Sequence, residues 1–337
     1  MATPLLFPAT PQNIELSAEE TRQLAAFGHQ QPSGPDDHGE QRLLANVERQ
    51  PLALPSLTDH RHALVETESI SQLLVDNAPI DATQLPPAPR DGQRPAGKSW
   101  CSEAVLLHTQ RALGLRPFAY AEECGGALIH QIAPVAGESH VASSAGRVPL
   151  GFHTDLAILR PPHRPHFLTL ICLRNEAQTP TLIAELDDAL AALHQRGPGL
   201  IAILRQPRFR LESPPRLRLW NGKILVSEPR PLLTPGPSGR EALAANLNSV
   251  RALDPEAEAA LLAFQAVLPD VTRPIPLRPG SLLIFNNFRV LHGRAAIRPG
   301  QRWLQRVYSS RSLEALQQAT NSAADRVIFS ISQLILE

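Results

Sequence analysis

The sequence predicts a mainly β fold with flanking helices, and three observations lead to this expectation. Short apolar and β-branched runs, separated by turn residues, fill most of the chain from residue 118 to residue 310. Helical periodicity is confined to the first 117 residues, to two insertions and to the tail. The 33 prolines add many loops and sheet edges. Many short strands in one half of a chain are typical of a β barrel or sandwich.

The first 117 residues predict a layer of helices and loops. Ser17 and Glu20, in the segment SAEE, match a capping box, which closes the first turn of a helix. That helix is expected to run to about Phe27. Residues 76–99 are rich in Pro, Asp and Gly and predict a long loop. Further helical patterns cover Glu40–Val47, Ser69–Leu74 and Ser102–Gly114.

The β core is predicted over residues 118–310, and residues 311–337 form a C-terminal segment with a helix. No linker divides the chain, so we expect a single domain over residues 1–337. Two helical insertions are expected at Ile183–Gln195 and Pro255–Leu268, and a tail helix at Ser312–Asp325. The strand-like runs are GGALIHQIAPV, RVPLGFHTD, HFLTLICLR, PGLIAILRQPRFRL, LRLWNGKILVSEP, GSLLIFNNFRVLHG and RWLQRVYSS.

Composition excludes several classes of partner. Lys plus Arg and Asp plus Glu are equal at 32 each, which argues against nucleic acid or an anionic membrane surface. No run of 18 apolar residues predicts a membrane span, and the N-terminus lacks the pattern of a signal peptide. The three cysteines are widely spaced and odd in number, as expected for reduced thiols in a cytoplasmic protein.

A candidate metal site begins in the segment GFHTD. His153 and Asp155 are two residues apart, and residues i and i+2 of a strand point to the same face. A third ligand, His292, follows the strand-like run GSLLIFNNFRVL. Two histidines and one carboxylate on one side of an ion leave three coordination positions open. Non-haem Fe(II) oxygenases need this arrangement for their cosubstrate and O2.

Other histidines offer weaker alternatives. His38 and Glu40 repeat the spacing of the first ligand pair, but in a loop rich in Pro and Gly. The pairs His60–His62 and His163–His166 are interpreted as solvated loop histidines.

Two arginines lie downstream of the distal histidine. Arg302 and Arg306 follow His292 by ten and fourteen residues, in the segment RWLQRVY. On a strand, Arg302, Leu304, Arg306 and Tyr308 share one face. Arginine is suited to bind a carboxylate through two parallel hydrogen bonds. The alternative is a pair of surface arginines bound to acidic side chains.

These segments, in this order, resemble the clavaminate synthase-like branch of the Fe(II)/2-oxoglutarate-dependent oxygenases, which includes amino-acid hydroxylases. The resemblance spans about Phe118 to Ser310 and implies a double-stranded β-helix, or jelly roll. It also implies that Arg302, helped by Thr181, binds the C5 carboxylate of 2-oxoglutarate. Thr181 is alternatively an ordinary helix N-cap or loop hydroxyl. The resemblance further places Arg306 on the α-carboxylate of an amino-acid substrate, and Ser143 with Glu122 or Glu123 on its backbone.

The sequence departs from that branch in two places. The first ligand pair is HTD, whereas the branch usually carries HTE, and the Asp at 155 argues against a halogenase, which leaves this ligand position open. Asn246 and Asn248 stand where the arginine hydroxylase of the branch has two aspartates. Neutral amides disfavour a buried cation, so the substrate side chain is expected to be neutral or anionic.

The expected function is therefore hydroxylation of an unactivated C–H bond of an amino acid, in secondary metabolism, with Fe(II), 2-oxoglutarate and O2. Two alternatives remain open. One is a hydroxylase or desaturase that acts on a small peptide or on an aminoacyl group carried by a peptidyl carrier protein. The other is a non-catalytic, cupin-like metal-binding protein.

Overall fold

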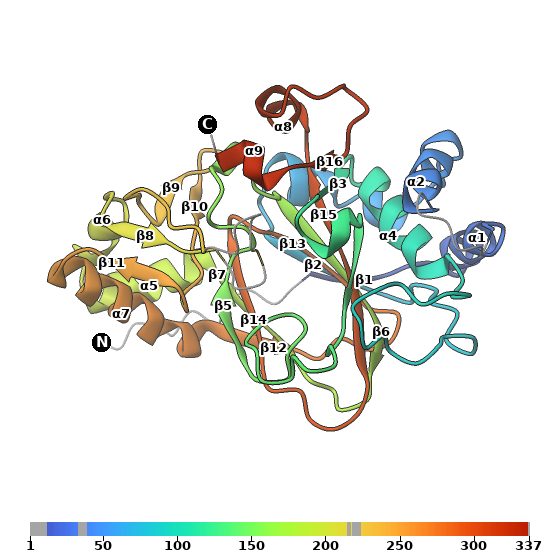
Figure 1. Cartoon of the computed structure of the whole chain (residues 1–337), viewed down its shortest axis with the longest axis horizontal. Coiled ribbons are helices and arrows are strands. Elements are labelled where there is room, and N and C mark those ends of the chain that lie inside the picture. The colour runs from blue at the N-terminus through green and yellow to red at the C-terminus, as the bar shows by residue number, and fades with distance from the viewer. Residues whose placement is uncertain (1–11, 33–38, 214–216, 218–223, 336–337) are drawn as a thin grey trace.

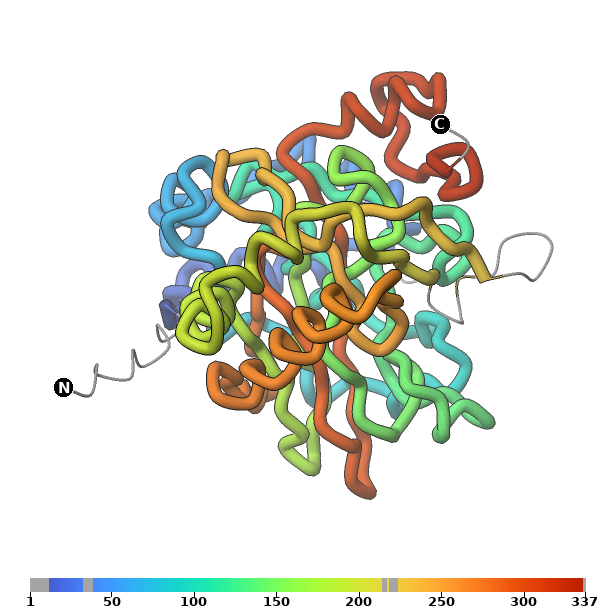
Figure 2. The backbone as a smooth tube through the Cα atoms, turned by 90° about the vertical axis from the view of Figure 1, so that its left-hand side faces the viewer, coloured from blue at the N-terminus to red at the C-terminus, as the bar shows by residue number. Residues whose placement is uncertain are grey.

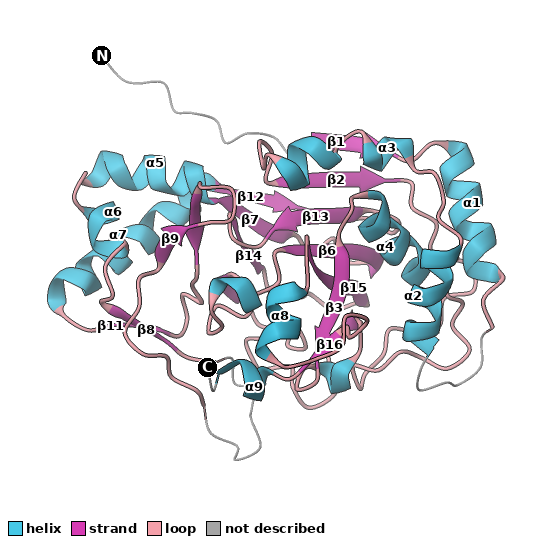
Figure 3. Ribbon diagram, turned by 90° about the horizontal axis from the view of Figure 1, so that it is seen from above, coloured by secondary structure: helices cyan, strands magenta, loops and turns pink. Residues whose placement is uncertain are grey.

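Two β-sheets lie at the centre of the molecule, with helices at both ends (Figures 1 and 3). The computed structural model describes residues 12–32, 39–213, 217 and 224–335. Within these ranges no helix is long and apolar enough to cross a membrane. The three cysteines are free thiols, and Cys101 and Cys172 are buried.

The larger sheet runs in the order β1-β2-β13-β6-β15-β3-β16, and β4 also pairs with β15. Its strands are β1 (Gln12–Glu15), β2 (Gln72–Asp76), β3 (Arg116–Tyr120), β4 (Ile129–Ile132), β6 (Phe167–Asn175), β13 (Leu282–Asn286), β15 (Arg302–Ser310) and β16 (Ile328–Phe329). The smaller sheet is antiparallel, in the order β12-β7-β14-β5. Its strands are β5 (Leu150–His153), β7 (Thr181–Glu185), β12 (Thr272–Ile275) and β14 (Val290–Arg294).

Helices cover the two ends of this β core. The N-terminal group lies against the larger sheet and comprises α1 (Ala18–His29), α2 (Gly39–Arg49), α3 (Pro55–Thr58) and α4 (Cys101–Ala112). At the opposite end lie α5 (Leu186–Arg196), α6 (Leu200–Leu204) and α7 (Pro255–Val271), and α7 stands in front of the sheets in Figure 2. Two small antiparallel sheets of two strands lie nearby, formed by β8 (Phe209–Leu211) with β11 (Val250–Ala252) and by β9 (Leu233–Pro235) with β10 (Glu241–Leu243). The chain ends with α8 (Glu314–Ala319) and α9 (Ile331–Ile335).

Strand β15 separates two hydrophobic clusters. Leu304 and Tyr308 pack into the cluster between the sheets and the α5–α7 end. Trp303 and Val307 pack into the cluster under the N-terminal helices. The strand is therefore covered on both faces. Successive side chains point to opposite faces, so every second side chain points into the space between the sheets.

Several predicted elements are confirmed. Ser17 caps α1 in a full capping box with Glu20, and helices occupy the predicted positions of α2, α4 and α7. The expected tail helix is shorter, because α8 covers only Glu314–Ala319. Part of the segment LRLWNGKILVSEP lies outside the described residues.

Three predicted elements are wrong. The segment Ser69–Leu74, predicted to be helical, leads into strand β2, which pairs with β1 on one side and β13 on the other. The insertion at Ile183 begins as strand β7, and its helix starts only at Leu186. The apolar run of α6, predicted as a strand, is helical. Short apolar runs carry no periodicity that distinguishes a helix from a strand, so tertiary pairing decides.

One buried carboxyl group in this fold predicts a pH-dependent stability. Glu40, at the start of α2, accepts hydrogen bonds from the backbone N–H groups of Leu128 (2.6 Å) and Ile129 (3.3 Å). Burial raises the pKa of Glu40 from 4.5 to about 7. The folded state thus holds this proton more tightly than the unfolded state does. The stabilisation of the folded state by protonated Glu40 is fully present below pH ~4.5 and is lost as the pH rises through about 7.

We therefore expect Glu40→Gln to flatten the fall in stability between pH 5 and pH 8, by up to about 3 kcal/mol. Urea unfolding of wild type and variant at both pH values measures this difference. Glu48→Gln, on the exposed face of the same helix, is the control and should follow wild type. Parallel pH profiles for wild type and Glu40→Gln would contradict the assignment.

Candidate active site

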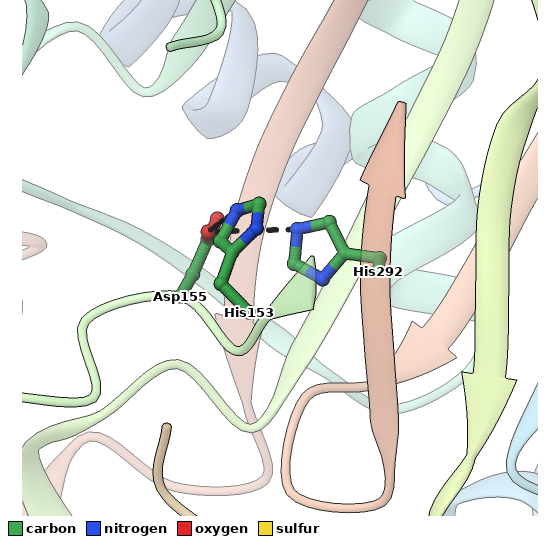
Figure 4. Close-up of side chains that lie close together, drawn as sticks. All are labelled: His153, Asp155 and His292. Atoms are coloured by element: carbon green, nitrogen blue, oxygen red, sulfur yellow. Dashed lines mark ion pairs between the residues drawn. The ribbon is translucent and has the colours of Figure 1, made fainter. Parts of the chain in front are cut away.

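His153, Asp155 and His292 come together between the two sheets, as predicted for a metal site (Figure 4). Their ligand atoms lie within 4.8 Å of one another. Asp155 Oδ1 is 3.2 Å from His153 Nε2 and 3.5 Å from His292 Nε2. All three side chains are at most 15 % exposed. Among the residues that the structure describes, no other group of three His, Cys, Asp or Glu side chains is placed to hold a metal ion.

The two histidines come from neighbouring strands, but Asp155 does not lie on a strand. His153 ends β5 and stands opposite His292 of β14, so their rings meet with centroids 4.2 Å apart. Asp155 lies in the turn that follows β5. The strand-parity argument for the His153–Asp155 pair is therefore wrong, although both side chains face the same point. Asp155 is held instead through its backbone by the side chain of Asn287, to which no pattern in the sequence points.

The hydrogen bonds and charges around the three residues suit a cation. His153 Nδ1 lies 2.9 Å from the carbonyl oxygen of Gly151, which leaves Nε2 to face the site. Burial, together with the nearby His153, lowers the pKa of His292 to about 4, so this ring is neutral at pH 7. Burial opposes ionisation of Asp155, but the charge of Arg306 and the contacts with His153 and His292 together outweigh it and hold the pKa well below its usual range. Two imidazoles and one carboxylate are the donor set expected for Fe(II).

A cavity of about 440 Å³ opens beside these residues. Arg302, Leu304, Arg306 and Tyr308 line it together, which confirms the predicted facing of the RWLQRVY segment. A bulge interrupts the pairing of β15 with β6, but the extra residue, Leu173, lies on β6. The alternation of β15 therefore continues from Arg302 to Tyr308.

Arg302 is a buried cation without an acidic neighbour. The residue is 4 % exposed, and its guanidinium forms no ion pair or hydrogen bond with any part of the chain that the structure describes. Burial lowers its pKa to about 10, so it remains charged at neutral pH. An unpaired buried charge is costly. Arg302 thus fits a carboxylate ligand that enters the cavity. Thr181, which also lines the cavity, belongs to β7, next to Arg294 of β14.

Arg306 lies against the metal ligands. Its guanidinium donates to Asp155 Oδ2 (2.7 Å) and to His130 Nδ1 (2.7 Å), and it lies 3.7 Å from Glu123 Oε1. The alternative of surface arginines is excluded for this side chain, which is 11 % exposed. His130 is a contact of Arg306 that sequence reasoning missed.

The remaining candidate residues line the same cavity but differ in what they contact. Glu122 accepts hydrogen bonds from Ser330 Oγ and from the first backbone N–H groups of α9, so its carboxylate holds the C-terminal helix. Ser143 Oγ accepts a hydrogen bond from the backbone of Ala145. Asn246 pairs with His153 through a β-bridge. Asn248 is exposed at the cavity rim.

The alternative histidines have other roles. His38 lies outside the described residues, and its partner Glu40 holds strand β4. His62 is exposed and contacts Glu66. The interpretation of His163 and His166 as solvated loop residues is wrong. Both are buried, and His166 Nε2 lies 2.9 Å from a carboxylate oxygen of Glu68, a contact that bridges 98 residues of sequence.

Two imidazoles and one carboxylate, facing a cavity that holds a buried unpaired arginine, define a mononuclear non-haem metal oxygenase. The chain belongs to the taurine catabolism dioxygenase TauD, TfdA family, whose sequence model matches residues 109–308. It is 31 % identical to L-asparagine oxygenase of Streptomyces coelicolor over 242 residues, which are 70 % of each protein. It is 28 % identical to clavaminate synthase 2 of Streptomyces clavuligerus over 281 residues, 77 % of this chain and 79 % of that protein. The resemblance to clavaminate synthase-like oxygenases is confirmed.

Solved structures agree with this assignment. Asparagine oxygenase in complex with Fe(II), 2S,3S-3-hydroxyasparagine and succinate is 25 % identical, with a TM-score of 0.78. The match covers 94 % of this chain and 99 % of that one. The non-haem iron oxygenase OrfP, in complex with Fe, succinate and (3S)-hydroxy-L-Arg, shares the fold, with 21 % identity and a TM-score of 0.79 over 95 % of this chain and 100 % of that one.

Proposed function

We propose that this enzyme is an Fe(II)- and 2-oxoglutarate-dependent hydroxylase of an amino acid. One observation carries the proposal: the unpaired guanidinium of Arg302 and the His153–Asp155–His292 cluster line the same cavity. A small dicarboxylic acid that reaches the metal with one end can place its other carboxylate on Arg302. The relatives named above are an asparagine oxygenase and clavaminate synthase 2, which supports both the cosubstrate and the substrate class.

Each residue has a distinct task in this proposal. His153, Asp155 and His292 hold Fe(II), which together with 2-oxoglutarate and O2 supplies the oxidant for an unactivated C–H bond. Arg302 binds the far carboxylate of 2-oxoglutarate, and Thr181 adds a hydroxyl donor. The two sheets form a double-stranded β-helix core, and residues 1–337 act as one domain. The lining of the cavity excludes bulk water from the reacting atoms.

The amino-acid backbone of the substrate is proposed to bind near Arg306. This guanidinium is anchored beside the metal ligands and offers one of the N–H groups that these two bonds leave unused to an α-carboxylate. Glu123, close to Arg306 and Tyr308, offers an acceptor to the α-amino group. Ser143, in the loop between β4 and β5, lines the same cavity. Because Glu122 is engaged by α9, Glu123 is the better candidate of the two.

Asn246 favours a substrate side chain that accepts hydrogen bonds. Its Oδ1 accepts the backbone N–H of Asn248 (3.2 Å), which fixes the orientation of the amide. The NH2 group is then the part of Asn246 that remains to bind a ligand in the cavity next to His153. An NH2 donor pairs with a carbonyl or carboxylate oxygen and not with a guanidinium or ammonium group. We therefore propose a substrate with an amide or carboxylate side chain.

The test is an anaerobic reconstitution with Fe(II) and 2-oxoglutarate, followed by exposure to O2 with single amino acids. Succinate formation and a mass increase of one oxygen atom identify the substrate. We expect Asn246→Asp to lower kcat/KM for the preferred substrate by about 100-fold, because an acceptor replaces the donor. Asn248→Asp adds the same charge at the exposed rim, and a much smaller loss is expected. Equal losses in both variants would contradict a direct contact of Asn246.

Two alternatives have their own outcomes in this assay. Turnover only of an aminoacyl carrier protein or a small peptide, by hydroxylation or desaturation, would favour the carrier-bound substrate. Absence of 2-oxoglutarate decarboxylation with every substrate would favour a cupin-like metal-binding protein. A third possibility is a structural jelly roll that uses no metal. It alone predicts that His153→Ala leaves Fe(II) affinity unchanged, so this variant separates it from the other two.

A further inference from the structure

A single side chain holds the backbone on both sides of Asp155. Asn287 Oδ1 accepts the backbone N–H of Asp155 (2.8 Å), and Asn287 Nδ2 donates to the carbonyl oxygen of Asp155 (3.0 Å). The same NH2 group donates to the carbonyl oxygen of Pro165 (3.0 Å). Because β5 ends at His153, this amide supplies the two hydrogen bonds that a partner strand would supply within a sheet.

The turn after Asp155 requires such support. Leu156 has a φ of +51°, in the left-handed region that a branched, bulky residue rarely adopts. Such a conformation costs about 1–3 kcal/mol and persists only where surrounding contacts impose it. Asn287 is fully buried and comes from the segment that follows β13, far from Asp155 in the sequence. It is therefore well placed to impose the turn.

The carboxylate of Asp155 is held as firmly as its backbone. Oδ1 faces the two histidines, whereas Oδ2 accepts hydrogen bonds from Arg306 Nη1 (2.7 Å) and from the hydroxyl of Tyr308 (3.0 Å). Arg306 is proposed to bind the substrate as well. Tyr308 is 2 % exposed and has no such second ligand, although its hydroxyl also lies 3.5 Å from Glu123. Its hydroxyl is the donor to Asp155 Oδ2, because an ionised carboxylate can only accept.

We propose that Asn287 and Tyr308 are positioning residues for Asp155, and that they fix this ligand in its metal-binding orientation before the ion arrives. Asn287 sets the backbone, and Tyr308 holds Oδ2, which leaves Oδ1 facing the two histidines that would share the ion with it. The proposal rests on the metal site of the proposed function. It assigns to both residues an effect on metal affinity that is separate from any contact with cosubstrate or substrate.

The chain offers a matched control for each residue. Tyr120 is the other tyrosine of the sequence; it is equally buried, and its hydroxyl donates to the carbonyl of His163 instead of to a metal ligand. Asn286 is as buried as Asn287, and its Oδ1 accepts the backbone N–H of Phe288 (2.9 Å). Tyr308→Phe and Tyr120→Phe each remove one hydroxyl. Asn287→Ala and Asn286→Ala each remove one buried amide.

The experiment measures the Kd of Co(II), an oxygen-stable probe, by its visible absorption, and the melting temperature with and without the ion. Tyr308→Phe and Asn287→Ala are expected to weaken Co(II) binding by about 10- to 100-fold, the usual cost of losing a partner of a metal ligand. Their melting temperatures should rise less on addition of Co(II) than those of the control variants. If Asn287→Ala does not fold, Asn287→Asp keeps the shape and the acceptor but loses the donor, and the same loss of affinity is expected.

Co(II) affinities of Tyr308→Phe and the Asn287 variant equal to those of their controls would overturn the proposal. Failure of the proposed function has a different signature. In that case wild type itself binds no Co(II), or His153→Ala binds it as well as wild type does.

Discussion

Replacement of Arg302 by alanine is expected to weaken 2-oxoglutarate binding by two to three orders of magnitude. Removing one partner of a buried ion pair costs about 3–5 kcal/mol, and each 1.4 kcal/mol is a factor of ten. The effect should be confined to the cosubstrate, because Arg302 contacts none of the three metal ligands. An anaerobic titration of the Fe(II)-loaded protein with 2-oxoglutarate, followed by its visible charge-transfer band, measures the affinity directly.

Replacement of Arg302 is also expected to change the stability of the protein. Without a ligand, Arg302 is a buried charge with no counter-ion among the described side chains, which destabilises the folded state. Arg302→Met should therefore raise the melting temperature of the protein without cosubstrate, while it lowers 2-oxoglutarate affinity. Arg302→Lys, which keeps the charge but not the planar fork, should lower affinity with little gain in stability. Unchanged 2-oxoglutarate affinity in Arg302→Ala would show that the carboxylate binds elsewhere.

Replacement of Glu68 by glutamine is expected to lower the free energy of unfolding by about 3–5 kcal/mol at pH 7. Glu68 is 1 % exposed and joins three separate segments through its carboxylate. It accepts hydrogen bonds from His166 (2.9 Å), Ser238 (2.7 Å) and Arg311 (2.6 Å). Burial lowers the pKa of His166, so this ring is neutral at pH 7 and donates through Nε2. Glutamine keeps the volume but leaves Arg311 without its counter-charge.

Glu68 also determines how the fold responds to acid. Burial alone would raise the pKa of Glu68, but the hydrogen bonds from His166 and Ser238 and the charge of Arg311 lower it from 4.5 to about 2. The ionised carboxylate thus stabilises the fold above pH ~4.5, and this contribution disappears as the pH falls toward 2. Urea unfolding at pH 7 and at low pH should show the gap between wild type and Glu68→Gln closing in acid. Glu66→Gln, an exposed neighbour, should match wild type at both pH values, and a constant gap for Glu68→Gln would contradict this account.

Much of the site could be predicted because it depends on local alternation. Every second residue of the segment, namely Arg302, Leu304, Arg306 and Tyr308, faces the cavity, as the alternation of a strand requires. The pairing of β5 with β14 then sets His153 opposite His292, and that contact joins segments far apart in the sequence. A family resemblance then assigned roles that periodicity alone does not contain.

What could not be predicted depends on contacts between distant residues. Asp155 faces the metal position because Asn287, 132 residues later, holds its backbone, and no local pattern records that pairing. The burial of His166 likewise follows from Glu68, which lies in a different part of the chain. The pattern of Ser69–Leu74 predicts a helix. Strand β2 forms there instead because its short apolar run acquires its conformation by pairing with β1 and β13.

The arrangement of β15 has a consequence for how genes of this kind can change. The residues proposed to bind cosubstrate, substrate and the iron ligand stand on one strand at Arg302, Arg306 and Tyr308. Insertion of a single codon between Arg302 and Arg306 would place Arg302 on one face of the sheet and Arg306 and Tyr308 on the other. Selection must therefore conserve the length of this strand, whereas the loop that carries Ser143 can gain or lose residues more freely. Substrate choice can diverge by such length changes while the oxidative chemistry is inherited intact.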